Sequence, residues 1–335
     1  MIHFRNDYND LAHPKLLEMM MTYQREAHLG YGMDHHSRKA RETIQKHIKT
    51  PVFIHFMTGG TSTNLTVISH LLKPFEAVIS AKTGHIEVHE TGAIEATGHK
   101  IITLETKDGK LTANMVKDAF ETFTDEHMVK PKMVYISQAT ETGMVYLKEE
   151  LIALYETCKA LDLYLFVDGA RLGVALTSNI SDLTLDDMVN YTDIFYIGGT
   201  KNGALLGEAL ITKHEHLDAY FRYSMKRQGG LLAKGFLVGM QFEGLFRDNL
   251  FFEIGRHANN MASYLVSGLK NIGLIFNETP TNQQFITLPK SKVEQLKKTY
   301  TFEIWQDFKT HQMIRLVTTY RTTKEDIDTL IFDLT

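Results

Sequence analysis

The order of apolar and polar positions predicts alternating strands and helices between about residues 50 and 212. Short apolar runs of strand length recur there, separated by segments in which apolar residues repeat every three or four positions. One such segment is "NLTVISHLL", in which Leu65, Ile68 and Leu72 share a helical face. The predicted strands are 52–57, 77–80, 100–104, 132–137, 163–167, 193–198 and 208–212. This alternation favours an α/β fold with a mostly parallel central sheet covered on both faces.

The pattern changes after residue 245. Two long helical segments cover about 236–270 and lead to the short apolar runs "QFITL", "TFEIW" and "MIRLVT", with an amphipathic helix near 323–332. This order indicates a smaller C-terminal α+β domain, as the length of 335 residues allows. We therefore predict three parts: an N-terminal arm at 1–20, a large domain at 21–245 and a small domain at 246–335.

Composition and charge narrow the classes of function. The net charge of −4 gives no electrostatic reason to expect nucleic acid or an anionic membrane as a partner. No uninterrupted apolar run approaches the ~18 residues of a membrane span. The start, "MIHFRNDYND", lacks the apolar core of a signal peptide, and a single cysteine excludes an intrachain disulfide. We expect a cytoplasmic protein without membrane or nucleic-acid partners.

The single cysteine, Cys158, is predicted to be structural. It shares a helical stripe with Leu151, Leu154, Tyr155 and Leu161 in the segment "KEELIALYETCKAL". A cysteine in such an apolar stripe behaves as a small buried hydrophobic residue. A buried thiol is therefore favoured over a nucleophile.

In open parallel sheets, ligands bind beyond the carboxyl ends of the strands. The first predicted strand is followed by "TGGTSTN". Gly59 and Gly60 permit a tight turn, and Thr61, Ser62 and Thr63 bring hydroxyls to a helix N-terminus, where an anion is favoured. The segment is therefore either a phosphate cradle or an ordinary helix N-cap with a glycine turn.

The second predicted strand is followed by "AKTGHIEVHETGA", which contains His85, Glu87, His89 and Glu90. His85 and His89 lie four positions apart and can share a helical face, which leaves a weak metal site open although no HExxH motif is present. Ring stacking or acid–base work by a histidine is another interpretation, and a polar helix start is the third.

Two later strand ends carry opposite charges. Asp168 directly follows the predicted strand "LYLFV". A carboxylate at this position either caps the next helix or pairs with a protonated ring nitrogen. Lys201 follows "DIFYIGGT". A lysine at a partly buried strand end is costly unless it is paired or used covalently, and lysines of lowered pKa form Schiff bases with aldehydes. Taken alone, Lys201 reads as a solvated loop lysine.

The combination is more informative than its parts. A phosphate cradle, a stackable histidine, a carboxylate for a ring nitrogen and a lysine for a Schiff base are what a pyridoxal 5′-phosphate (PLP) site requires. Each follows a predicted strand, so the parallel sheet would bring all four to one edge.

At this point the chain resembles the threonine aldolases, which belong to the fold-type I PLP enzymes and to the β-eliminating lyase/aldolase superfamily. The resemblance runs nearly end to end. Its most specific parts are "DGAR" and the strand-end lysine 33 positions after Asp168. The matching segments are "FRNDY" (4–8), "GYGMD" (30–34), "GGTSTN" (59–64), "HIEVHETGA" (85–93), "FVDGARL" (166–172), "GGTKNGALLGEAL" (198–210) and "IRLVT" (314–318).

The resemblance implies the following cofactor contacts. Lys201 holds PLP covalently, Asp168 pairs with the pyridinium nitrogen and Arg171 lies near the ring hydroxyl. Gly60 and Thr61 hold the phosphate. The expected fold is a large PLP-binding domain with a smaller C-terminal domain.

It also implies roles around the substrate. His85 stacks on the cofactor ring and helps to move a proton, and Glu90 orients His85 or a catalytic water. Arg315 binds the substrate carboxylate, for which its two-pronged guanidinium is suited. Without the resemblance, Arg315 in "MIRLVT" would read as one exposed residue of an edge strand. Tyr31 reaches the site of a neighbouring subunit, so a homodimer or homotetramer is implied.

The sequence departs from the family pattern at several positions. Asn6 stands where a serine contacts the substrate carboxylate, Thr200 keeps the hydroxyl of a serine before the lysine, and Asn202 replaces a glycine. The segment "SQATETGMVY" lacks the family's histidine and arginine, so a different side-chain pocket is expected. Arg227 and Lys234 both flank "QGGLLA" and are alternative phosphate contacts.

The implied activity is PLP-dependent retro-aldol cleavage of a β-hydroxy-α-amino acid, such as threonine, allo-threonine or phenylserine, to glycine and an aldehyde. The hydroxyl base is either His85 or a water held by Glu90 and His85. One alternative is a PLP-dependent β-eliminating lyase, which would release pyruvate and ammonia. Another is a non-catalytic relative that binds PLP or an amino acid. A nicotinamide-binding module is disfavoured because no GxGxxG motif follows an early strand.

Overall fold

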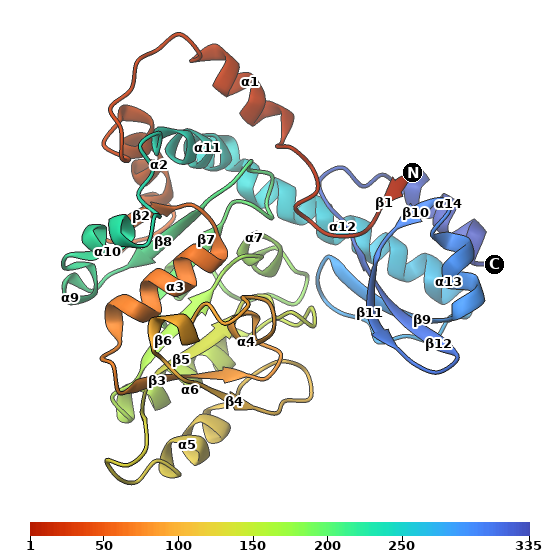
Figure 1. Cartoon of the computed structure of the whole chain (residues 1–335). Coiled ribbons are helices and arrows are strands. Elements are labelled where there is room, and N and C mark those ends of the chain that lie inside the picture. The colour runs from red at the N-terminus through yellow and green to blue at the C-terminus, as the bar shows by residue number, and fades with distance from the viewer.

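The structure is a computed structural model that describes all residues, 1–335. It has a larger part built on a seven-stranded sheet and a smaller part formed by the C-terminal segment (Figure 1). All seven strands predicted between residues 50 and 212 are present, and they lie in the order β2-β8-β7-β6-β5-β3-β4. They are β2 (Phe53–Met57), β3 (Glu76–Ala81), β4 (Ile101–Leu104), β5 (Lys130–Ser137), β6 (Tyr164–Asp168), β7 (Ile194–Gly198) and β8 (Glu208–Thr212).

Strand direction in this sheet confirms the α/β prediction. Strands β3, β4, β5, β6 and β7 pair in parallel. Strand β8 is antiparallel to both of its neighbours, β7 and β2. Since β2 and β7 both oppose β8, they run in the same direction. The carboxyl ends of β2, β3, β5, β6 and β7 therefore meet at one edge of the sheet.

Helices cover both faces of the sheet, as its side-chain alternation requires. On β3 and β5, Ile79 and Val134 belong to one buried apolar cluster, whereas Val78 and Met133 belong to a second. The helices of this part are α2 (His35–Gln45), α3 (Gly60–Leu71), α4 (His85–Val88), η1 (Glu95–Thr97), α5 (Ala113–Glu121), α6 (Lys148–Ala160), α7 (Leu172–Leu176), α8 (Leu185–Asn190), α9 (Glu215–Asp218), α10 (Phe221–Arg227) and α11 (Phe236–Phe246). No helix of the chain has the length and apolar character needed to cross a membrane.

The smaller part contains an antiparallel sheet of order β11-β12-β9 and helices, which agrees with the predicted α+β character of the C-terminal segment. Its strands are β9 (Gln283–Pro289), β11 (Glu303–Asp307) and β12 (His311–Val317), and its helices are α13 (Lys290–Leu296) and α14 (Lys324–Leu334). Strand β12 is the middle strand, and Arg315 on it is only 8% exposed. The reading of Arg315 as an exposed residue of an edge strand is therefore wrong, because β11 pairs along its outer side.

Two segments connect the larger and smaller parts. Helix α12 (Leu250–Asn271) follows the short turn η2 (Arg247–Asn249) and places Phe251 in the large core and Leu265 in the C-terminal core. The first residues also contact both parts. Strand β1 (Ile2–His3) pairs with β10 (Tyr300–Thr301), whereas α1 (Pro14–Thr22) packs Leu16 into the large core. Figure 1 shows the N-terminus beside the C-terminal elements.

The prediction of a structural thiol is confirmed. Cys158 on α6 is completely buried within the large apolar core. Burial and the nearby charge of Asp193 raise the pKa of the thiol to about 12. A thiol with so high a pKa carries almost no thiolate at neutral pH and is chemically inert.

Candidate functional site

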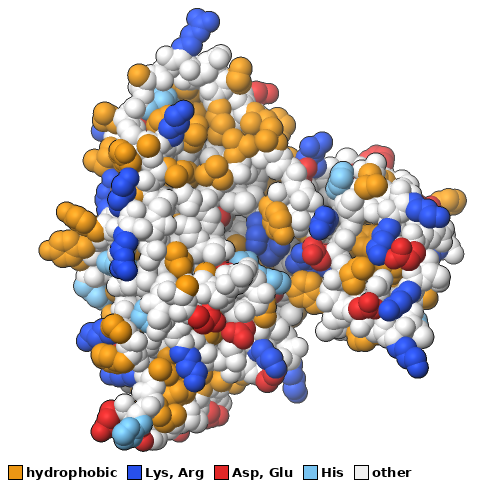
Figure 2. Space-filling model, viewed as in Figure 1, with side chains coloured by type: hydrophobic (Ala, Val, Ile, Leu, Met, Phe, Trp, Pro, Cys, Tyr) orange, Lys and Arg blue, Asp and Glu red, His pale blue; other side chains and the backbone are white.

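A cleft of about 610 Å³ opens between the carboxyl edge of the large sheet and the C-terminal part. Figure 2 shows the hollow between the two parts, with basic and histidine side chains at its border. The larger part contributes polar side chains from several strand ends, and the smaller part contributes an aromatic and a basic residue. The residues that matter most below are His85, Glu141, Arg171, Lys201, Trp305 and Arg315.

Glycines allow the strand ends that carry Asp168 and Lys201 to approach each other. A Cβ atom on Gly169 would lie 1.8 Å from the carbonyl oxygen of Tyr196, and one on Gly198 would lie 2.2 Å from that of Ala170. No other residue fits such contacts, because the obstructing atoms are backbone atoms. The segments after β6 and β7 therefore pack backbone against backbone at this edge.

Asp168 is a buried carboxylate behind the cleft, 3% exposed. Its Oδ2 accepts hydrogen bonds from the Tyr135 hydroxyl and from Asn64 Nδ2 (3.2 Å), and its Oδ1 accepts one from the backbone N–H of Ala170 (2.9 Å). Burial acts to raise the pKa of Asp168, but the charge of His85 and hydrogen bonds from Tyr135, Tyr196 and Ala170 outweigh it and lower the pKa. The side chain is therefore held as an anion.

His85 is oriented by a second buried carboxylate. Its Nδ1 lies 2.7 Å from Glu90 Oε1, and the Glu90 side chain is fully buried. The same Glu90 oxygen accepts a hydrogen bond from Asn64 Nδ2 at 2.7 Å. Asn64 thus connects Glu90 to Asp168. Asn64 was not predicted, although it ends the motif "GGTSTN", because both interpretations of that motif, phosphate cradle and helix N-cap, concern its glycines and hydroxyls.

Lys201 is enclosed by charged groups. Burial and the positive charge of Arg171 lower the pKa of Lys201, and the carboxylates of Asp7, Asp168 and Glu208 oppose that change. Its Nζ lies 5.8 Å from the centroid of the Tyr8 ring. A lowered pKa makes the neutral amine more accessible, as a lysine that reacts with an aldehyde requires.

The loop that carries Lys201 is fixed from behind by Glu208, a carboxylate that sequence reasoning missed. Thr200 Oγ1 donates a hydrogen bond to Glu208 Oε1 (2.9 Å) and accepts one from the Gly207 N–H (3.0 Å). The Gly199 N–H donates to Glu208 Oε2 (2.9 Å). Burial raises the pKa of Glu208 to about 8. The sequence feature that could have pointed to Glu208 is a glutamate at the start of the mostly apolar strand "EALIT".

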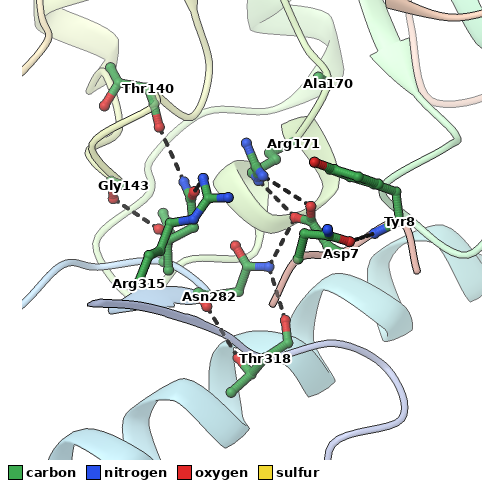
Figure 3. A network of polar contacts seen from close by, with 12 residues as sticks. Asp7, Tyr8, Thr140, Gly143, Ala170, Arg171, Asn282, Arg315 and Thr318 are labelled. Atoms are coloured by element: carbon green, nitrogen blue, oxygen red, sulfur yellow. Dashed lines mark hydrogen bonds and ion pairs between the residues drawn. The ribbon is translucent and has the colours of Figure 1, made fainter. Parts of the chain in front are cut away.

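Arg171 is held by Asp7, a second residue that sequence reasoning missed. Its Nε and Nη2 donate to the two oxygens of Asp7 at 2.7 and 2.9 Å. Figure 3 shows Asp7 between Arg171 and Asn282, whose Nδ2 also donates to Asp7 (3.2 Å). The neighbouring Asn6 is 7% exposed, and its Oδ1 accepts a hydrogen bond from the backbone N–H of Tyr8 (3.1 Å).

Arg315 reaches the same region from β12. Its Nη1 donates to Gln283 Oε1 (3.2 Å), its Nη2 lies 3.6 Å from Glu303, and its guanidinium carbon lies 5.0 Å from the Trp305 ring centroid. Its Nε is buried without a hydrogen-bond partner. Figure 3 shows the guanidinium pointing toward the side that carries Arg171. The Arg315 side chain lines the cleft, so the guanidinium is placed to meet an anionic ligand there.

Helix α3 starts at Gly60 and Thr61 without a side-chain N-cap hydrogen bond. The N-cap residue is Gly59, so the helix start is compatible with both predicted alternatives, a glycine N-cap and a phosphate cradle. A Cβ on Gly60 would lie 3.1 Å from the Tyr196 hydroxyl, so the backbone passes close to that side chain. Free N–H groups at the start of a twelve-residue helix suit an anion.

Three other candidate residues lie outside this cleft. Tyr31 is 43% exposed, and its carbonyl oxygen accepts a hydrogen bond from Arg222 Nη2 (3.1 Å). Arg227, at the end of α10, and Lys234 are both exposed, and neither lines the cleft. Gly60 and Thr61 do not line the cleft either, and Gly230, between Arg227 and Lys234, lies against Ser62 of the same motif, so the choice between Arg227 and Lys234 stays open.

No third metal ligand lies close enough to complete a metal site with His85 and His89. Their ring centroids are 5.4 Å apart. The one group of three His, Cys, Asp or Glu residues whose ligand atoms lie within 4.8 Å of one another is Glu26, His28 and His36, none of which lines the cleft.

Comparison with known proteins agrees with this geometry. Residues 12–291 match the β-eliminating lyase family. The low specificity L-threonine aldolase of Pseudomonas sp. (strain NCIMB 10558) is 33% identical over 284 residues, which cover 81% of each chain. That of Pseudomonas aeruginosa is 31% identical over 301 residues, which cover 86% of each chain.

Solved structures extend the likeness to the whole chain. A threonine aldolase of Leishmania major superposes with a TM-score of 0.98 at 43% identity and covers 100% of this chain and 98% of its own. An aspartate aminotransferase of Thermus thermophilus, at 15% identity and a TM-score of 0.73, shares the fold and covers 100% of this chain and 91% of its own. The chain therefore has the fold-type I architecture and belongs to the β-eliminating lyase family and, within it, to the threonine aldolases.

Proposed function

We propose that the protein is a PLP-dependent aldehyde-lyase that cleaves a β-hydroxy-α-amino acid to glycine and an aldehyde. Threonine, allo-threonine and phenylserine-like amino acids are the proposed substrates. The observation that carries the proposal is the convergence of Lys201, Asp168, His85 and Arg315 around one cleft, in a chain 33% identical to a low specificity L-threonine aldolase.

The residues of the cleft fit PLP. The buried anion of Asp168 suits the pyridinium nitrogen, and Lys201, with its lowered pKa, suits covalent attachment. The start of α3 at Gly60 and Thr61, which has no side-chain cap hydrogen bond, suits the phosphate. When bound, PLP supplies an electron sink for the Cα–Cβ bond that breaks.

Arg315 is proposed to bind the substrate carboxylate. Its ring contact with Trp305 and its hydrogen bond to Gln283 hold the guanidinium plane, and a guanidinium that lines the cleft suits a carboxylate. Asn6 is proposed to assist from the arm, since its Oδ1 is used by Tyr8 and its Nδ2 is left to donate. Together they would fix the amino acid so that its Cα lies toward Lys201.

His85 is proposed to stack on the cofactor ring and to help move a proton. Glu90 accepts from Nδ1, which leaves Nε2 as the nitrogen able to exchange a proton with water or substrate. Arg171, fixed by Asp7, is proposed to lie near the ring hydroxyl, and Thr200 to hold the lysine loop through Glu208.

We also propose a cytoplasmic homodimer or homotetramer in which Tyr31 reaches the partner's cleft. Exposed apolar side chains gather near Tyr31: Leu29 is 70% exposed, Met33 61% and Tyr223 76%. Figure 2 shows apolar side chains on the side that carries α1, α2 and α10. An apolar patch of this kind is typical of an interface with another chain. Light scattering of the purified protein tests the assembly, and a monomer would contradict it.

The test of the activity is direct. The purified, PLP-loaded protein is incubated with L-threonine, L-allo-threonine and L-phenylserine, and glycine and aldehyde are both quantified. Equal yields of the two products are expected. Ammonia with a keto acid in their place, 2-oxobutanoate from threonine or phenylpyruvate from phenylserine, would instead indicate a β-eliminating lyase, and no turnover of any substrate would indicate a binding protein.

A further inference from the structure

Glu141 is a carboxylate of the cleft for which the roles above give no use. It lies on the loop after β5, two strand ends from the Lys201 loop in the sheet order, and it lines the cleft together with His85, Arg171 and Lys201. It is 8% exposed. A charged side chain this deeply buried is costly unless it is bonded or used.

The Glu141 carboxyl group is held by hydrogen bonds from other residues to one of its two oxygens. Glu141 Oε1 accepts hydrogen bonds from the Ser137 hydroxyl (2.7 Å) and from the backbone N–H of His85 (3.1 Å). These contacts pin the carboxyl group beside the start of α4. The hydrogen bonds that Glu141 accepts from other residues both end on Oε1, and the side chain lines the cleft, so Oε2 is the oxygen that we assign to a ligand.

The other carboxylates nearby are committed elsewhere. Glu90 is fully enclosed by His85 and Asn64, and Asp168 lies behind the cleft. Asp7 is bonded through both oxygens to Arg171. Glu303, the second carboxylate that lines the cleft, stands on the C-terminal part and lies 3.6 Å from Arg315. Glu141 is therefore the carboxylate of the larger part that is open to the substrate.

The electrostatic setting suits proton transfer. Burial raises the pKa of Glu141, the Ser137 hydrogen bond opposes that change, and the negative charge of Asp168 adds to it. A carboxyl group whose pKa is moved toward neutrality is a better general base at physiological pH than an ordinary one. His85, by contrast, already has Nδ1 committed to Glu90 and is proposed to stack on the ring.

We propose that Glu141 is a catalytic residue that takes the proton of the substrate's β-hydroxyl group through Oε2. This inference rests on the proposed aldolase function. The O–H bond breaks and its proton goes to the carboxylate. The oxygen lone pair forms the aldehyde C=O bond, and the Cα–Cβ bond breaks with its electron pair left on Cα. A proton then returns to Cα and glycine is formed, so that atoms and electrons balance.

The test compares Glu141→Gln with wild type and with Glu87→Gln, a matched control on an exposed residue of α4. We expect kcat for L-threonine cleavage to fall about 10²–10⁴-fold in Glu141→Gln, as for the loss of a general base. Exchange of the glycine α-proton in deuterated water, followed by NMR, should stay within about threefold of wild type, because that reaction involves no hydroxyl group. Glu87→Gln should match wild type in both assays.

Two further measurements separate catalysis from structure. In Glu141→Ala, added formate or acetate should restore part of the cleavage rate, because a small carboxylate can occupy the vacated space. Infrared difference spectra of the cofactor-free protein, wild type minus Glu141→Gln, should show a carboxyl band that titrates above the range of an ordinary glutamate.

The outcomes distinguish this inference from the function on which it rests. If wild type exchanges the glycine proton but cleaves none of the three β-hydroxy amino acids, the proposed function falls. If wild type cleaves them and Glu141→Gln retains kcat within about threefold, Glu141 is not the base. Equal losses of cleavage and of glycine exchange, without rescue by formate, would also overturn the inference, because they would indicate a structural role.

Discussion

The ion pair between Asp7 and Arg171 provides a sharp test of how the N-terminal arm supports the cleft. We predict that Asp7→Asn destabilises the fold far more than a single exposed charge would. The two side chains are 2% and 7% exposed, and both Asp7 oxygens accept from the guanidinium. Asparagine keeps the shape and one acceptor but leaves the positive charge of Arg171 uncompensated in the interior.

The magnitude follows from burial. Breaking a buried pair by removing one charge costs about 3–5 kcal/mol in the free energy of unfolding. Because asparagine retains one acceptor for Arg171, about 3 kcal/mol is expected. Burial alone would raise the pKa of Asp7, but Arg171 and Lys201 lower it overall. A lowered folded-state pKa means that the stabilisation is present above the ordinary value of 3.8 and is lost as the pH falls through the folded-state pKa.

The assay is urea unfolding at pH 7, followed by circular dichroism. The matched control is Asp10→Asn on the same arm, whose carboxylate lies 3.4 Å from Arg321 with side chains 26% and 66% exposed. That exposed pair should contribute less than about 1 kcal/mol. The difference between wild type and Asp7→Asn should also shrink at acidic pH, as Asp7 becomes protonated. Equal losses for the two variants would refute the reasoning.

Four other changes have expected outcomes. Lys201→Ala should lose turnover and the visible absorbance of lysine-bound PLP, and an unchanged spectrum would contradict its assignment. Arg315→Lys should raise KM for the amino acid about tenfold or more in steady-state kinetics, because lysine offers no two-pronged contact; an unchanged KM would argue against carboxylate binding. Gly239→Ala should lower the melting temperature, since its Cβ would lie 2.6 Å from Ser37 Cα and separating α11 from α2 costs about 1–3 kcal/mol; an unaltered melting curve would contradict this contact. Iodoacetamide should modify Cys158 in urea but not in the folded protein, as judged by mass spectrometry, because burial raises the pKa of the thiol to about 12.

Much of the fold was predictable because the sheet is buried on both faces. A strand covered on both sides must be apolar at nearly every position, so each of the seven strands stands out as a short run. Their order was not predictable in the same way. Strand β8 lies between β2 and β7 and is antiparallel to both. Its apolar composition indicates neither its direction nor which strands it pairs with. For the same reason, the middle position of β12 could not be read from "MIRLVT" alone.

The site was predictable where a residue follows a strand directly. Asp168 and Lys201 meet because the glycines beside them permit backbone contact, and both the strands and the glycines are visible in the sequence. Asp7, Asn64 and Glu208 were missed although each lies inside a recognised motif. Their importance comes from burial against residues far away in the chain, such as the 164 positions between Asp7 and Arg171, and local patterns do not report such contacts.

The same distant contacts explain why the arm matters to the chemistry proposed here. A substrate held by Arg315 on β12 and cleaved near Lys201 must bridge the smaller and larger parts, so their separation sets the fit. The arm is bonded to both. Phe4 packs in the C-terminal core, and its carbonyl accepts a hydrogen bond from the N–H of Val317 (2.8 Å), two residues after Arg315. Asp7 binds Arg171 beside the cleft. Because only two residues, Arg5 and Asn6, lie between Phe4 and Asp7, the arm links the residue proposed to bind the carboxylate to the side of the cleft where the bond would break.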